Sequence, residues 1–201
     1  MPRGIPNLCV LSICQAEKTS VPQPTEQLPL IGSNAEHPGN FVSIDMIHSP
    51  IGGLIPVSKG KIIKDKYQIA CVFVDQCTKF VYVTYQLSTS SVETVESKQK
   101  FEKFAASHGV QIRHHRADNG AFNTRVFKES VAAARQTIDF CGANAHHQNG
   151  LIECMIQTLT YRARALLLHA MYHWSAVVTA ELWPFPLWMV VETHNNSPLP
   201  N

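Results

Sequence analysis

Apolar and polar residues follow two different periods along the chain, and from about Phe41 onward they predict a succession of strands and helices. Residues 41–47 roughly alternate apolar with polar, which predicts a strand. Two dense runs of β-branched and aromatic residues, 67–75 and 79–85, predict adjacent antiparallel strands of a central sheet. Between these and the first strand, Gly52-Gly53 and the spaced lysines at 59, 61, 64 and 66 indicate a hairpin-like or looped excursion.

The second half of the chain shows helical periods separated by short strands. Ser90 and Glu93 have the spacing of a capping box, and the helix that follows is expected to end near Gly109. Short strands are expected over 110–115 and 137–141, on either side of a helix over 122–135.

A long helix is expected from Asn149, and its apolar positions form one stripe: Ile152, Met155, Ile156, Leu159, Ala163, Leu166, Leu167 and Ala170. A further apolar helical region around 174–183 is expected to be interrupted or kinked by Pro184 and Pro186. The order of these elements predicts an α/β fold with a mixed sheet.

Length and composition set the outer limits. With 201 residues, 45% of them hydrophobic and 16% charged, the chain can bury one good core or at most two small ones. Residues 1–38 are rich in proline and lack an apolar period, so they are expected to be an extended tail ahead of a folded unit at 39–201. Six unevenly spaced cysteines favour a reducing, intracellular location. No apolar run approaches the roughly 20 residues that span a bilayer, so no membrane partner is expected.

Three carboxylates occupy places that suit chemistry. Asp45 lies within an otherwise apolar strand, Asp118 directly follows a strand, and Glu153 falls in the first turn of the long helix if Asn149 is its N-cap. Carboxylates that converge from two strands and a helix start suit a pair of hard divalent cations.

Each carboxylate also has a purely structural interpretation. Strand edges tolerate aspartate, Asp-Asn-Gly is a strong turn signature, and the helix dipole favours glutamate in a first turn. On the long helix, Glu153, Gln157, Thr160 and Arg164 are expected to share a polar face opposite the apolar stripe.

Several segments together resemble one known family. They are Pro38-Gly-Asn-Phe-Val-Ser-Ile-Asp45, Val72-Phe-Val-Asp-Gln-Cys-Thr-Lys-Phe-Val-Tyr82, Arg116-Ala-Asp-Asn-Gly-Ala-Phe122, Ala145-His-His-Gln-Asn-Gly-Leu-Ile-Glu153, Leu159-Thr-Tyr-Arg-Ala-Arg-Ala-Leu-Leu-Leu-His169 and Glu181-Leu-Trp-Pro184. In this order and spacing, the chain resembles the catalytic core of retroviral-type integrases, and specifically those of copia-like long-terminal-repeat retrotransposons. The resemblance runs from about Pro38 to about Pro198.

The resemblance implies a fold and a chemistry. The fold is ribonuclease-H-like, a mixed five-stranded sheet flanked by helices. The implied activity is DNA 3′-end processing and strand transfer with Mg²⁺ or Mn²⁺, held by a metal-binding and catalytic triad that falls on Asp45, Asp118 and Glu153. Asp75 resembles the family's non-catalytic acidic strand residue. The family also implies DNA ends and target DNA as partners, a homo-oligomer when active, and the nucleus as the place of action.

Candidate DNA contacts are the polar and basic residues near the triad or on the lysine-rich loop: Lys59, Lys61, Lys64, Arg116, Asn119, His147, Gln148, Asn149, Gln157 and Arg164. A solvated loop explains the lysines equally well. His114 and His115 are adjacent in an expected strand and point to opposite faces, so only one could join a site. Metal ligation is therefore the weaker hypothesis for them, as it is for the His146-His147 pair.

The first 38 residues do not reproduce the zinc module that precedes this domain in complete integrases. Cys9 and Cys14 are separated by four residues where the module has two, and no paired histidines precede them, so zinc is not expected and we interpret residues 1–38 as a decayed or truncated remnant of that module. Two other functions remain open on the sequence. One is a non-catalytic relic that keeps the fold and binds nucleic acid or self-associates. The other is an endonuclease or ribonuclease of the same fold.

Overall fold

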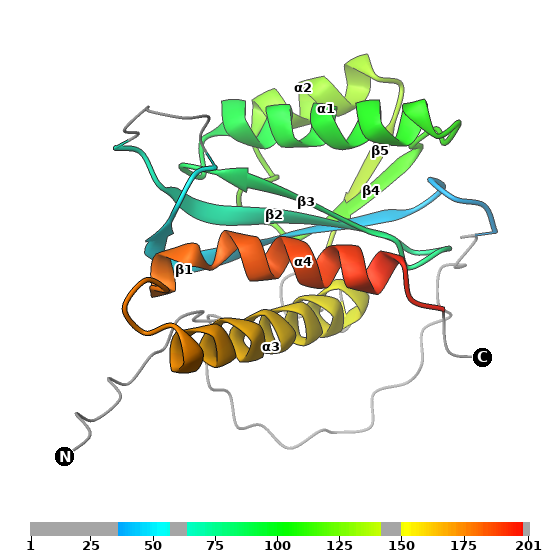
Figure 1. Cartoon of the computed structure of the whole chain (residues 1–201). Helices are drawn as coiled ribbons and strands as arrows, with labels where there is room; N and C mark the ends of the chain where they lie inside the picture. The colour runs from blue at the N-terminus through cyan, green and yellow to red at the C-terminus, as the bar shows by residue number, and fades with distance from the viewer. Residues whose placement is uncertain (1–35, 57–63, 142–149, 199–201) are drawn as a thin grey trace, which may run out of the picture.

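The described chain forms three layers, with a mixed sheet between two pairs of helices (Figure 1). The computed structural model describes residues 36–56, 64–141 and 150–198. The strands are β1 (Val42–Gly53), β2 (Tyr67–Asp75), β3 (Val81–Gln86), β4 (His114–Ala117) and β5 (Thr137–Phe140). The helices are α1 (Ser91–Ser107), α2 (Arg125–Ala133), α3 (Gly150–His173) and α4 (Pro184–Asn195), with a 3₁₀ turn at Ala180–Leu182. The expected mixed five-stranded α/β architecture is confirmed.

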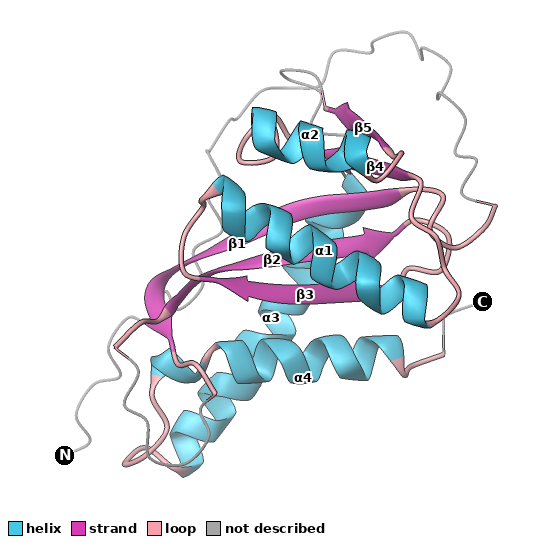
Figure 2. Ribbon diagram, turned by 90° about the horizontal axis from the view of Figure 1, so that it is seen from above, coloured by secondary structure: helices cyan, strands magenta, loops and turns pink. Residues whose placement is uncertain are grey.

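The sheet order is β3-β2-β1-β4-β5. β1 pairs antiparallel with β2, and β2 with β3, as the sequence predicted for the two dense apolar runs. β4 lies parallel to β1, and β5 lies parallel to β4. Viewed from above, α1 and α2 cross one face of this sheet (Figure 2).

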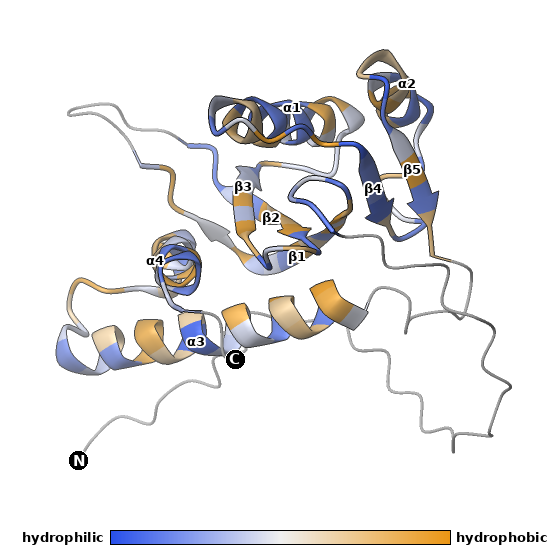
Figure 3. Cartoon of the chain, turned by 90° about the vertical axis from the view of Figure 1, so that its right-hand side faces the viewer, coloured by the Kyte–Doolittle hydropathy of each residue, from blue (hydrophilic) through white to orange (hydrophobic). Residues whose placement is uncertain are grey.

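Each face of the sheet has its own apolar core, because successive side chains of a strand point to opposite faces. Val42 and Ile44 of β1 pack with Phe73, Phe101 and other residues under α1 and α2. The opposite face buries alternate residues of β2 against α3 and α4: Ala70, Val72 and Val74 pack with Ile152, Leu159, Trp183 and Leu187. Figure 3 shows the two helix pairs on opposite sides of the sheet.

The start of α1 keeps half of the predicted capping box. Ser90 Oγ accepts a hydrogen bond from the Glu93 N–H at 3.3 Å, as expected for an N-cap. The Glu93 carboxylate does not return to the Ser90 N–H. It accepts instead from the N–H groups of Leu87 and Ser88, at 2.6 and 3.3 Å. The glutamate therefore ties the incoming loop to the helix.

The hairpin-like excursion expected after the first strand is confirmed, because β2 returns antiparallel beside β1, but it begins later than expected: Gly52 and Gly53 still belong to β1, and Gly53 pairs with Tyr67 after a register shift that follows His48. The expected interruption of a helix by proline is wrong. Pro184 and Pro186 do not interrupt a helix; they stand in the first turn of α4, with Pro184 at its first position. The N–H groups of a first helical turn have no intrahelical partner, so proline loses nothing there. Of the segment 174–183, only the turn at Ala180–Leu182 is helical.

The apolar stripe of α3 is largely confirmed, with one polar addition. Ile152, Ile156, Leu159, Ala163 and Leu167 are buried, whereas Leu166 is exposed. Thr160, expected on the polar face, is buried instead, and its hydroxyl donates to the Ile156 carbonyl at 2.8 Å. This local bond satisfies the hydroxyl and lets a threonine join the buried face.

The remaining boundaries shift by a few residues. The strand expected over 110–115 forms over His114–Ala117, because the preceding segment pairs elsewhere: the Arg113 N–H donates to the Gly39 carbonyl. The helix expected over 122–135 is shorter, with Thr124 as its N-cap. The expected N-cap Asn149 and the tail up to residue 35 lie outside the described residues.

Candidate carboxylate site

The register of the two central strands places Asp45 and Asp118 side by side. Ile44 of β1 pairs with Ala117 of β4, so Asp45 and Asp118 are the next residues along two parallel neighbours. Val42 and Ile44 face α1, so Asp45 faces the opposite side of the sheet, where α3 lies. Glu153 is in the first turn of α3.

The backbone holds one oxygen of each aspartate. Asp45 Oδ1 accepts from the Met46 N–H at 2.7 Å, and Asp118 Oδ1 accepts from the Gly120 N–H at 3.1 Å. A Cβ at Gly120 would lie 3.1 Å from both Asp118 carboxylate oxygens, so glycine gives the carboxylate its room. The carboxamide of Asn119 donates to the Cys141 carbonyl at 2.9 Å, which fixes this turn to the end of β5.

The negative charges of Asp118 and Glu153 act on the ionisation of Asp45. The pKa of Asp45 is raised from 3.8 to about 6, mainly because burial disfavours its charged form. The Met46 N–H opposes this rise, while the negative charges of Asp118 and Glu153 add to it. Asp118 and Glu153 themselves are exposed. The site is thus a partly buried aspartate flanked by two solvent-facing carboxylates.

One thiol, Cys141, borders this site, and the sequence gave no reason to place it there. The pKa of Cys141 is raised by burial, lowered by Arg116, and raised by Asp118, Glu153 and Asp45. Cys141 directly follows β5, and its N–H donates to the carbonyl of Ala117 at the end of β4, which brings it to the site. Cys71 instead packs in the core on the α1 side of the sheet, and its pKa is raised by burial and by Asp45.

The candidate DNA-contact residues fall into three groups. Arg116 is close enough to the site to lower the pKa of Cys141. The Asn119 carboxamide donates to the carbonyl of Cys141, directly after β5. Gln157 and Arg164 are exposed on α3, and Lys64 is exposed three residues before β2. Lys59, Lys61, His147, Gln148 and Asn149 lie outside the described residues. Lys66, directly before β2, forms an ion pair with Glu181.

Other residues singled out by sequence have structural contacts. Asp75 is buried, and its oxygens accept from the Gly39 N–H at 2.9 Å and from the Thr78 N–H and hydroxyl at 2.7 Å. His114 and His115 point to opposite faces as expected. His114 lies by Asp139 and Thr137, and His115 lies by Glu102 and Gln136.

The donor set suits a hard divalent cation. Three carboxylates supply the oxygen ligands that Mg²⁺ and Mn²⁺ prefer, and a bound cation would offset the repulsion that helps raise the pKa of Asp45. Within the described ranges, no three histidine, cysteine, aspartate or glutamate side chains already form a group that could hold a metal ion. To bind a cation, the exposed side chains of Asp118 and Glu153 would have to move toward Asp45.

Solved structures that share this arrangement of strands and helices include integrase catalytic cores. The HTLV-2 integrase catalytic core domain in complex with magnesium, in its trimeric form, is 21% identical, with a TM-score of 0.50 over 76% of this chain and 84% of that one. The catalytic core domain of BIV integrase is 14% identical, with a TM-score of 0.54 over 81% of this chain and 88% of that one. The chain has the fold of a retroviral integrase catalytic core.

A third structure shares this integrase-core fold. A chain of the simian T-cell lymphotropic virus intasome is 18% identical, with a TM-score of 0.57 over 89% of this chain and 63% of that one. The present chain thus spans less than two thirds of that protein. No model of a protein family matches the sequence, and no curated protein matches it either. In the part of the chain that is described, no helix is both long and apolar enough to cross a membrane.

Proposed function

We propose that this chain is the catalytic domain of a retrotransposon integrase, of the copia-like type, which processes DNA 3′ ends and joins them to target DNA. The observation that carries the proposal is the placement of three carboxylates on one face of the sheet: Asp45 and Asp118 lie on the paired central strands, and Glu153 begins the helix on the side that Asp45 faces. The integrase-core fold supports it, and the motif segments favour the copia-like type. Action in the nucleus, as a homo-oligomer on DNA, follows from the same proposal.

The residues would divide the work by position. Asp45 and Asp118 would bind the cation from neighbouring strands, and Glu153 would bind it from the start of α3. The chemistry that comes with bound Mg²⁺ or Mn²⁺ is activation of the attacking oxygen and neutralisation of the leaving 3′ oxygen. Arg116, Gln157 and Arg164 would orient the phosphate backbone. No nucleophilic side chain is needed, because the attacking group is water or a DNA hydroxyl.

The test is nicking and strand joining of DNA oligonucleotides with Mg²⁺ or Mn²⁺, by the full chain and by its Glu153→Gln variant. The substitution keeps the shape of the side chain but removes its charge, so turnover should fall by several orders of magnitude. DNA affinity at fixed salt should change little, because it depends on basic contacts with phosphates. The free energy of unfolding should change by less than about 1 kcal/mol, because Glu153 is exposed.

Glu96→Gln is the matched control, since Glu96 is also an exposed glutamate on a helix but lies on α1, across the sheet. It should retain wild-type turnover. A Glu153→Gln variant as active as wild type would exclude Glu153 from the site. A wild-type chain that binds DNA but is inert with every cation tried would favour the non-catalytic relic instead.

A further inference from the structure

A pair of histidines at the far end of α3 is separate from the carboxylate site. His169 and His173 are four residues apart, so they project from one face of the helix. Both are exposed, and their ring centroids are 4.5 Å apart with the planes inclined at 57°. Glu153 is at the other end of the helix, about 30 Å away at 1.5 Å rise per residue.

The sequence on either side of this pair contains no charged side chain that would compete for a metal ion. No lysine, arginine, aspartate or glutamate occurs from Ala165 to Ala180. The pair also ends the helix, where the carbonyl ends of the peptide dipoles favour a cation. Rings of Tyr172 and Trp174 flank His173, with centroids 5.2 and 5.7 Å from its own. The only strong ligands presented by this segment are therefore two imidazoles.

We propose that His169 and His173 together bind a borderline transition-metal cation of the Zn²⁺ or Ni²⁺ class, through one imidazole nitrogen each. Two nitrogens on a tetrahedral Zn²⁺, each about 2.1 Å from it, are about 3.4 Å apart. Rings with centroids 4.5 Å apart can present facing nitrogens at that separation by side-chain rotation alone. Imidazoles spaced i, i+4 on one helix face are an established way for helices to chelate such ions.

The same geometry sets the strength and selectivity of the site. Only two protein ligands are present, so the remaining positions are open to water or to a ligand from outside, and the bound ion exchanges readily. Mg²⁺ prefers oxygen ligands and is a poor competitor at an imidazole pair. The carboxylate site has the opposite preference. One helix would therefore carry a hard-cation site at its start and a borderline-cation site at its end.

The test is calorimetric titration of the untagged full chain with Ni²⁺, in a thiol-free reductant and with excess Mg²⁺ present to occupy the carboxylates. We expect a saturable event of one Ni²⁺ per chain that His169→Gln or His173→Gln weakens by about tenfold or more. His48→Gln is the control, because His48 is another exposed histidine, on β1, and should leave the titration unchanged. Paramagnetic Ni²⁺ should broaden the ring resonances of His169 and His173 in preference to those of His48.

Two results would overturn the proposal. One is the absence of a saturable Ni²⁺ event in the wild-type chain. The other is binding that persists at full strength in the His169→Gln/His173→Gln double variant, which would locate the ion elsewhere, for example at His146 and His147. Circular dichroism of the two single variants and the double variant checks that α3 still forms, so a loss of binding cannot come from unfolding. Neither result bears on the carboxylate chemistry.

Discussion

At Asp45, two opposing effects set the pKa. Burial and the charges of Asp118 and Glu153 favour the protonated form, while the Met46 N–H favours the carboxylate. The first group prevails and raises the pKa to about 6. In the metal-free protein, ionised Asp45 is therefore destabilising relative to the unfolded chain, where the pKa is near its ordinary value. A bound cation would reverse that cost, which is how such a residue couples metal binding to stability.

Asp45→Asn should stabilise the metal-free protein near neutral pH. Because the folded pKa lies above the unfolded one, the stability that protonated Asp45 gives is present at low pH and is lost as pH rises through about 6. The full effect is at most about 3 kcal/mol, from 1.36 kcal/mol per pKa unit. Urea unfolding in EDTA should show the variant more stable than wild type at pH 7.5 and nearly equal to it at about pH 3, below the unfolded pKa of 3.8. Equal stability at pH 7.5 would contradict the burial argument.

At the scale of elements, short polar contacts decide where helices begin. Ser90 and Glu93 begin α1 by capping it and by tying Leu87 and Ser88 to it. Partial burial alone would raise the pKa of Glu93, but the hydrogen bonds from Ser88, Leu87 and Ser90 together outweigh it and lower that pKa. Pro184 begins α4 because a first turn needs no N–H from it.

Ser90→Ala should lower the free energy of unfolding by about 1 kcal/mol, because the N–H of Glu93 loses its side-chain acceptor. Thr89→Ala is the matched control: Thr89 is exposed directly before the cap. Chemical denaturation of the two variants makes the comparison. A loss of the same size in both would mean that the cap hydrogen bond is not the cause.

Gly53→Ala should destabilise the protein by about 2 kcal/mol, as overpacking of a core commonly does. A Cβ at Gly53 would lie 2.5 Å from Pro184 Cγ and 2.7 Å from Trp183 Nε1, and that indole N–H donates to the Ile51 carbonyl. Gly150→Ala is the control, since nothing lies within 4 Å of a Cβ there. Thermal melts should show a clear drop for the first variant and little change for the second.

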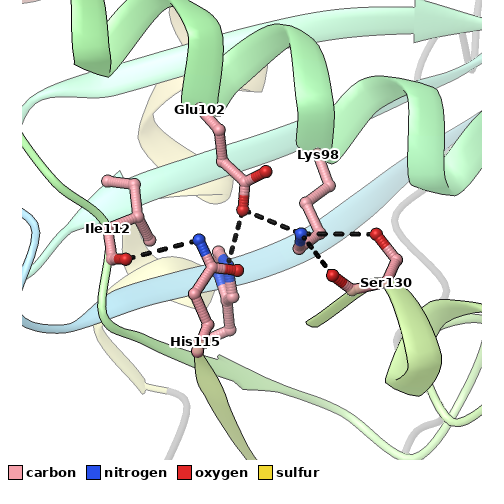
Figure 4. A network of polar contacts seen from close by, with 6 residues as sticks. Lys98, Glu102, Ile112, His115 and Ser130 are labelled. Atoms are coloured by element: carbon pink, nitrogen blue, oxygen red, sulfur yellow. Dashed lines mark hydrogen bonds and ion pairs between the residues drawn. The ribbon is translucent and has the colours of Figure 1, made fainter. Parts of the chain in front are cut away.

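At the scale of the whole molecule, a buried polar network joins α1, α2 and β4 (Figure 4). Lys98 is 1% exposed; it pairs with Glu102 at 2.8 Å and donates to the carbonyl and hydroxyl of Ser130 at 3.3 Å. His115 lies beside the same Glu102 carboxylate. Burial alone would raise the pKa of Glu102, but hydrogen bonds with His115, Lys98 and Gln136 outweigh it and lower that pKa.

Lys98→Met should destabilise the whole domain by about 3 kcal/mol, because it leaves the partly buried Glu102 without its cation. Adding Glu102→Gln should cost less than the two single losses combined, because the second change removes the unpaired charge. Lys100→Met, at an exposed position on the same helix, controls for the loss of a lysine. Strictly additive losses would show that Lys98 and Glu102 do not interact energetically.

Local signals were sufficient wherever neighbours in sequence make the structure. The β2 run of β-branched and aromatic residues, the Ser90–Glu93 cap and most of the α3 stripe follow from propensity, pairing and period within a few residues. The three candidate carboxylates could be selected from their motifs, but their assignment as a catalytic site stays a prediction. The expectation for Pro184 failed, and the excursion expected at Gly53 begins later, because proline and glycine occur in breaks, first turns and strand ends alike, and only packing chooses among them.

Contacts between distant residues were decided by the tertiary structure alone. The pairing of Ile44 with Ala117 brings Asp45 beside Asp118, and α3 packing against that face brings Glu153 to them. The burial of Lys98 and His115 around Glu102 likewise depends on how α1 meets β4. The physical reason is that sequence patterns report which face is apolar, whereas burial, electrostatic coupling and pKa depend on which other faces are brought against it.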